Sequence, residues 1–170
     1  MRSTVLNRLI IAVILLVSDL AFSAGTVVFE GVGSPGFLTI EGKGGKIKGD
    51  LTVKGDKSSG IFEVDLKNFD TGIALRNDHM KKKYLEVDTY PTAKLNLFPV
   101  IIPKDGKFMW AGDLTLHGVT KKIEGSAEVL NKVIDVTFSL KMSDFKIKKA
   151  IYLGVGLDDK ISITASLDLP

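Results

Sequence analysis

The chain has 170 residues, no cysteine and a formal net charge of +3 at neutral pH, with acidic and basic residues interspersed. The lack of cysteine excludes disulfides, thiolate metal sites, a cysteine nucleophile and lipid attachment at a lipobox cysteine. The nearly balanced charge gives no electrostatic support for a nucleic-acid-binding protein.

The first residues predict a secretory signal peptide. Two arginines open the chain, an unbroken apolar run covers residues 9–17, and small residues end the segment near Ser23. A retained membrane anchor would need about 20 apolar residues, and Ser18 and Asp19 interrupt the run too early for one. We expect cleavage after Ser23, with Ala24 as the alternative, and a periplasmic location.

Removing the 23 residues of this signal peptide, residues 1–23, leaves 147 of the 170. That is the size of one ordinary domain, large enough to bury a core. We therefore expect residues 24–170 to form a single domain, and no internal repeat or interdomain linker contradicts this.

Alternation of apolar and polar residues dominates this domain. Residues 61–67, 133–142 and 160–169 place apolar side chains on one face and polar ones on the other, as half-buried antiparallel strands do. Weaker strand candidates are 26–30, 36–41, 46–54, 92–98, 107–117, 119–129 and 148–153. Turn signals separate them, namely GVGSPG, GKGG, KGDKSSG, PKDGK and LDDK.

Long strands with one apolar face predict an all-β barrel. A strand of ten residues is roughly 33 Å long, and an open sheet of such strands would leave two long exposed edges. Closure into an antiparallel barrel of about eight strands removes both edges. Such a barrel encloses either a filled core or room for one apolar ligand, and the pattern does not choose between them.

Residues 74–86, with the sequence ALRNDHMKKKYLE, break the alternation. Good helix formers dominate this run, so we expect a short helical insertion between two strands. Pro91 then favours a turn, after which the next strand begins.

This region and its surroundings resemble the YceI-like family of exported bacterial polyisoprenoid-binding proteins. The resemblance covers most of the domain and rests on several motifs in order. They are Asp70 to Gly72, the set Arg76, Asn77 and His79, the pair Tyr90 and Pro91, the signature Leu114, Thr115, His117, Gly118, Val119 and Thr120, and the run Ser143 to Phe145. The start of the domain matches less well, because the aromatic residue and the His-Ser pair common at this point in the family are absent.

The resemblance implies a lipocalin-like barrel whose apolar interior takes an isoprenoid chain, a quinone tail or a similar amphiphile. No resident cofactor is expected beyond this lipid. The side chains expected to contact it are Phe62, Val64, Arg76, His79, Tyr90, Leu95, Trp110, Val136 and Phe138.

The polar residues of the insertion allow two interpretations. Arg76, Asp78 and His79 could form a catalytic or headgroup-binding set, or Arg76 could brace the helix over the barrel through its planar guanidinium. We favour the brace, with Arg76 and His79 also facing the mouth. His79 and His117 could share a metal ion, but two ligands rarely suffice and no acidic residue recurs at ligand spacing, so no metal site is expected. No nucleophile elbow, zinc-binding or phosphate-loop motif is present, so no catalytic residue is expected.

The expected function is therefore to sequester or transport an amphiphilic lipid in the cell envelope, without catalysis. The alternatives are a filled-core envelope stress or interaction protein that acts through its surface, and an accessory that presents quinone to a membrane oxidoreductase. We expect a monomer or homodimer. A membrane surface is a possible further partner through transient contact, because the lysines at 81–83, 146, 148 and 149 could meet anionic lipid headgroups.

Overall fold

The computed structural model describes residues 18–21, 25–34, 38–152 and 154–169. The expected signal peptide, residues 1–23, lies outside the described residues except for Ser18–Ala21, which form the short strand β1 beside β3.

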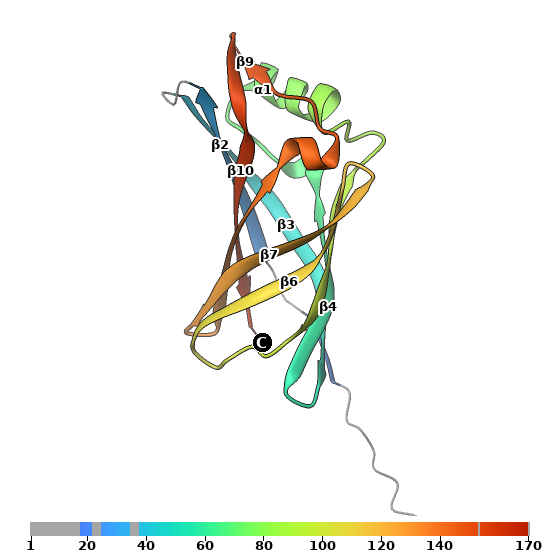
Figure 1. Cartoon of the computed structure of the whole chain (residues 1–170), viewed down its shortest axis with the longest axis vertical. Coiled ribbons are helices and arrows are strands. Elements are labelled where there is room, and N and C mark those ends of the chain that lie inside the picture. The colour runs from blue at the N-terminus through green and yellow to red at the C-terminus, as the bar shows by residue number, and fades with distance from the viewer. Residues whose placement is uncertain (1–17, 22–24, 35–37, 153, 170) are drawn as a thin grey trace, which may run out of the picture.

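Eight strands close into an antiparallel barrel (Figure 1), as the alternation predicted. Each strand pairs with the next one along the barrel, and the last pairs with the first to close the ring. The strands are β2 (Gly25–Ser34), β3 (Leu38–Lys54), β4 (Lys57–Asp65), β5 (Thr92–Val100), β6 (Gly106–Leu116), β7 (Val119–Leu130), β8 (Val133–Lys141) and β10 (Val155–Asp168). The strand β9 (Ile151–Tyr152) lies beside β10, outside the ring.

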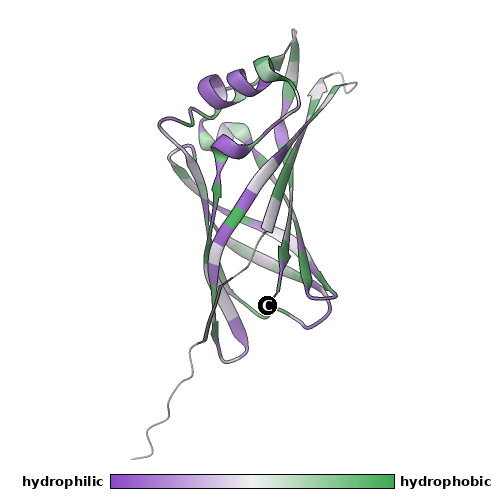
Figure 2. Ribbon diagram, turned by 180° about the vertical axis from the view of Figure 1, so that it is seen from behind, coloured by the Kyte–Doolittle hydropathy of each residue, from purple (hydrophilic) through white to green (hydrophobic). Residues whose placement is uncertain are grey.

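The register aligns the apolar residues of neighbouring strands on the inner face. Ala165 of β10 pairs with Val27 on one side and Val136 on the other, and Val136 pairs with Ala127 of β7, which pairs with Phe108 of β6. Directly opposed residues in a sheet share one face, so these five side chains form part of one inward belt. Figure 2 shows hydrophobic and hydrophilic residues alternating along the strands.

Two expected turns are wrong. GKGG, residues 42–45, lies inside β3, and LDDK, residues 157–160, lies inside β10, each beside an irregularity in register. A Cβ at Gly42 would lie 2.1 Å from the ring of Phe29, and one at Gly45 would lie 2.6 Å from the ring of Phe69. These glycines therefore give space to two packed aromatic rings, and do not reverse the chain.

Three strand candidates also differ from expectation. The candidates at 36–41 and 46–54 are parts of the single strand β3, which begins at Leu38. The candidate at 148–153 is reduced to the two residues of β9.

A helical insertion connects β4 to β5, as expected for residues 74–86. It begins with η1 (Leu66–Asn68), and its main part is α1 (Ala74–Asp78) continued by η2 (His79–Tyr84). Helical structure ends two residues early, and Glu86 adopts a left-handed conformation with φ of 46°. The helix lies across one end of the barrel, opposite the C-terminus (Figure 1), and we call this the helix end. Within the described residues, no helix is long and apolar enough to cross a membrane.

The strands β7 and β8 separate toward the helix end. Their pairing is confined to Ser126–Leu130 and Val133–Thr137. The short helix η3 (Met142–Phe145) follows β8 and contacts β7, β8 and β10. Its Phe145 side chain is 1% exposed, so η3 closes the wall where the backbone ladder stops.

Candidate functional site: an apolar cavity with a polar end

The barrel encloses a cavity of about 290 Å³. On β6 its wall runs from Phe108 to Leu116, which is about 26 Å of strand at ~3.3 Å per residue. Inward-facing aliphatic and aromatic side chains make up almost all of the wall. The polar side chains among the described lining residues are Thr71, Arg76, His79 and Tyr84, and all four come from the insertion.

Eight of the nine residues predicted to contact a ligand lie on this wall. They are Phe62, Val64, Arg76, His79, Leu95, Trp110, Val136 and Phe138. Tyr90 does not line the cavity, because its ring packs against the ring of His117 with centroids 4.5 Å apart. That these residues bind a ligand stays a prediction, and for Tyr90 the structure offers no place on the wall.

The end of the cavity opposite the helix is closed by aromatic packing. The rings of Trp110 and Phe138 meet edge to face with centroids 5.4 Å apart. Trp110 is 5% exposed, and its indole N–H donates to the carbonyl of Ser126 at 3.4 Å. Ile102 and Phe108 pack in the same cluster. The side chains at this end are apolar, and they suit the tail of an amphiphile better than a polar head.

Arg76 braces the loop that precedes the helix. Its Nε donates to Oγ1 of Thr71 at 3.0 Å, and its terminal nitrogen donates to the Thr71 carbonyl. Thr71 is 9% exposed, so these bonds satisfy polar groups that have little access to water. The arrangement agrees with the favoured interpretation of Arg76 as a brace.

Asp70 and Asn77 complete this loop. The amide of Asn77 donates to Asp70 Oδ1 at 2.6 Å, and the backbone N–H of Gly72 donates to the same atom at 2.8 Å. These two bonds, the Asn77 contact first, hold the pKa of Asp70 below its ordinary value. The backbone of Asp70 also exchanges two hydrogen bonds with Lys43 of β3, at 2.8 and 2.9 Å. The start of the insertion is thus tied to the barrel wall.

The end of the helix is tied to β9 by Tyr84. The Tyr84 hydroxyl donates to the carbonyl of Ile151 at 3.2 Å and accepts from the Ile151 N–H at 3.0 Å. Both residues also line the cavity. Sequence reasoning missed Tyr84 and Thr71. The partner of Tyr84 is 67 residues away in the chain, and the burial of Thr71 depends on how the insertion folds.

His79 differs from the other polar lining residues. Among the described residues, its ring has no hydrogen bond or ion pair, whereas Thr71, Arg76 and Tyr84 are all hydrogen-bonded within the protein. The imidazole is partly exposed at the helix end of the cavity. It is therefore the side chain that can offer a hydrogen bond to a molecule inside.

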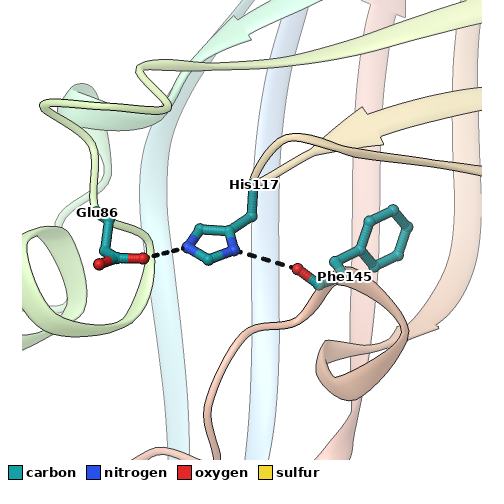
Figure 3. A network of polar contacts seen from close by, with 3 residues as sticks. All are labelled: Glu86, His117 and Phe145. Atoms are coloured by element: carbon teal, nitrogen blue, oxygen red, sulfur yellow. Dashed lines mark hydrogen bonds and ion pairs between the residues drawn. The ribbon is translucent and has the colours of Figure 1, made fainter.

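His117 joins three segments at the helix end (Figure 3). It lies in the tight turn between β6 and β7, with φ of 50°, and its side chain is 10% exposed. Its Nε2 lies 2.7 Å from Oε2 of Glu86, and its Nδ1 lies 3.2 Å from the carbonyl oxygen of Phe145. His79 and His117 do not share a site, and no group of three or more His, Cys, Asp or Glu side chains suited to a metal ion is present in the described part of the chain.

Comparison with known proteins agrees with this architecture. A UPF0312 protein of Vibrio cholerae is 30% identical over 99 residues, which are 56% of this chain and 52% of that protein. A UPF0312 protein of Vibrio vulnificus is 29% identical over 126 residues, covering 66% of this chain and 67% of that protein. The match with the Vibrio cholerae relative thus spans about half of that protein's length.

Solved structures share the fold at low sequence identity. BcnA of Burkholderia cenocepacia superimposes with a TM-score of 0.70 at 20% identity, covering 84% of this chain and 94% of BcnA. A polyisoprenoid binding domain from Saccharophagus degradans gives a TM-score of 0.65 at 15% identity, covering 92% of this chain and 99% of that domain. The Campylobacter jejuni YCEI protein gives 0.61 at 18% identity, with 77% and 86% covered.

The model of the YceI-like domain matches residues 20–169, which include every strand of the closed barrel. The chain therefore belongs to the YceI-like domain family.

Proposed function

We propose that this protein binds an amphiphilic lipid with an isoprenoid or quinone-like tail inside the barrel, and sequesters or transports it in the cell envelope without chemical conversion. The observation that carries the proposal is the continuous apolar cavity, in which the polar side chains among the described lining residues all come from the insertion at one end. A related barrel from Saccharophagus degradans is described as a polyisoprenoid binding domain, which supports the same ligand class.

The cavity has the apolar character of a lipid site. Its volume of about 290 Å³ is roughly twice that of an apolar protein cavity that holds one benzene ring. An apolar site of this kind favours hydrocarbon, since burying each CH₂ group contributes about 0.8 kcal/mol before the costs of ordering. A cavity of this extent supports lipid binding over the filled-core alternative.

The distribution of polar groups gives the ligand a direction. We place the tail toward Trp110 and Phe138 and the headgroup beside His79. Arg76 and Tyr84 already form hydrogen bonds within the protein. These bonds support a structural role for both residues around the headgroup, and not a catalytic one. A headgroup with a hydrogen-bonding oxygen, such as a quinone carbonyl or a prenol hydroxyl, fits the single open imidazole.

Trp110 makes the proposal testable, because it is the single tryptophan of the chain and lines the cavity. A short-chain prenylquinone added to the purified protein in mild detergent should quench its emission in a saturable manner. Organic extraction of protein purified from its native host, followed by mass spectrometry, should show an apolar species near one equivalent.

A pair of neighbouring residues on β10 provides matched variants. Ala165 faces the cavity and Thr164 faces outward, so Ala165→Phe should block binding while Thr164→Phe should retain it. Both variants need melting curves, because added bulk in a packed core costs about 1–3 kcal/mol. Saturable quenching that survives Ala165→Phe, or an extract without any apolar species and no quenching, would refute binding in the barrel.

A further inference from the structure

Three large apolar side chains are exposed around the helix end. Ile73, just before α1, is 41% exposed, Leu75 in α1 is 59% exposed, and Ile151 in β9 is 56% exposed. The exposed parts of these side chains do not pack into the buried core. We call these three residues the apolar rim.

The apolar rim lies at the opening of the cavity. Ile151 lines the cavity although more than half of its surface is exposed to solvent, so the wall meets water at this residue. Tyr84 joins Ile151 to the end of the helix, and Ile73 and Leu75 lie at the start of the same helix. Figure 1 shows the helix and β9 side by side at this end.

Two groups of lysines lie in the segments that carry the apolar rim. Lys81, Lys82 and Lys83 follow on the helix, and Lys146, Lys148 and Lys149 lie in the segment that leads from η3 to β9. Asp78 pairs with Lys82 at 2.6 Å and raises the pKa of that lysine. Within the described residues the other five lysines have no ion pair, and four to eight basic residues on one face are enough to attract an anionic lipid surface.

Acidic groups lie at this end as well, and Glu86 is held against His117. Asp70 accepts from Asn77 and Gly72, Asp159 accepts from Ser143, and both carboxylates keep their negative charge because these partners are neutral. With Asp88, Asp144 and Asp158 they make five carboxylates without an ion pair among the described residues, as many as the lysines without one. The helix end is therefore nearly balanced in charge, and its positive charge is local, in the run 81–83 and in the segment that follows η3.

We propose that the helix end docks on a bilayer surface that contains anionic lipid, with the apolar rim entering the headgroup region and the lysines contacting lipid phosphates. Amphipathic surfaces with basic residues beside apolar ones bind membranes in this way. Docking places the cavity opening against the membrane from which an amphiphile would be drawn, and to that extent the inference rests on the proposed function. A second copy of the chain is the rival occupant of this surface.

Flotation with lipid vesicles tests the proposal directly. The protein without residues 1–23 should float with vesicles of phosphatidylcholine and phosphatidylglycerol at 7:3, and not with phosphatidylcholine alone. Raising the salt from about 0.1 to 0.5 M should weaken the interaction severalfold, because screening shortens the reach of exposed charges.

Variants separate the contributions of the two features. Ile73→Ser with Leu75→Ser should reduce the vesicle-bound fraction at least fivefold, and Lys81→Gln with Lys83→Gln should weaken partitioning roughly 25-fold at about fivefold per lysine. Met109→Ser is the control for the apolar changes, since Met109 is 67% exposed on β6 away from the apolar rim. Lys57→Gln is the control for charge, because Lys57 is exposed at the start of β4, at the end of the barrel far from the helix, and the change removes the same single charge. It should leave the vesicle-bound fraction nearly unchanged.

The outcomes are distinct. No flotation with anionic vesicles, or equal losses in the rim and control variants at unchanged melting temperature, would overturn the proposal. A dimer in light scattering that Ile73→Ser with Leu75→Ser dissociates would assign the surface to a second copy instead. Quenching of Trp110 by a prenylquinone in detergent is measured separately, so loss of docking and loss of lipid binding are distinguishable.

Discussion

The Nε2 atom of His117 lies 2.7 Å from Oε2 of Glu86, although the two residues are 31 positions apart in the chain. The other ring nitrogen faces the backbone carbonyl of Phe145 at 3.2 Å. A carbonyl and a carboxylate can only accept hydrogen bonds, so the ring satisfies both when each nitrogen carries a proton. His117 then clasps the helical insertion and η3 to the turn between β6 and β7 (Figure 3).

Breaking this clasp should loosen the helix end. His117→Asn keeps a residue that tolerates the positive φ of this turn but cannot span both partners. We expect the free energy of unfolding to fall by about 1–3 kcal/mol, the usual cost of losing a buried or charged hydrogen bond. Amide exchange should also accelerate between residues 85 and 90. The control is Asp88→Ala, a change to an exposed neighbour, and equal exchange in both variants would contradict the clasp.

The contact between Asp159 and Ser143 should make the free energy of unfolding depend on pH in the acidic range. Asp159 accepts from the Ser143 hydroxyl and from its backbone N–H, and these bonds, the hydroxyl first, hold the pKa of Asp159 below its ordinary value. A carboxyl with a lowered pKa in the folded state stabilises the fold above its unfolded pKa, about 4, and loses this effect as pH falls through the folded value.

The pH dependence of melting can isolate this contribution. Wild type should melt higher than Asp159→Asn at pH 6, and the difference should shrink as pH falls below about 4. The difference should be small because Asp159 is exposed to solvent. Asp158→Asn is the matched control, because the Ser143 hydroxyl and backbone N–H bond to Asp159 and not to this neighbour. A difference that stays constant from pH 6 to pH 3 would rule out the ionised Asp159 contact as its source.

The alternation of apolar and polar residues predicts the barrel and which side chains face its interior. It predicts the polar contacts of the candidate site less well. Val136 and Phe138 could be placed inside because a period of two fixes which face a side chain occupies once one face is buried. The glycines of GKGG have the composition of a turn, and the rings of Phe29 and Phe69 that require them become neighbours only in the folded barrel.

The same limit applies to the polar contacts. The planar, multiply donating guanidinium favoured Arg76 as a brace, and its partner Thr71 is only five residues away. The partners of His117 lie 28 and 31 residues away, so the sequence offered only an unexplained histidine beside a glycine. Tyr90 was expected at the ligand for its place in a motif, whereas its ring lies against His117.

Arg76→Lys should separate bracing from ligand binding. A lysine ammonium cannot reproduce the two directed bonds that the guanidinium makes to the Thr71 hydroxyl and carbonyl. We expect a loss of about 1–2 kcal/mol in the free energy of unfolding, with prenylquinone affinity at low temperature nearly unchanged. Lys82→Gln on the exposed side of the same helix should leave stability within about 0.5 kcal/mol. Lost affinity with unchanged melting would instead identify Arg76 as a headgroup contact.

His79 should show the opposite behaviour. Its ring lies on the cavity wall and has no hydrogen-bond partner among the described residues, so His79→Leu should leave the melting temperature almost unchanged. If the imidazole bonds to the headgroup, removing one such bond should weaken prenylquinone binding about twofold to tenfold in the Trp110 assay. A hydrocarbon with the same prenyl tail should bind the variant and wild type equally well. Its affinity is measured by its competition with the quinone, as a loss of Trp110 quenching. Tyr90→Phe is the matched control, because Tyr90 lies outside the cavity and should leave both affinities unchanged. Equal weakening for the quinone and the hydrocarbon would show that His79 shapes the wall and does not bind the headgroup.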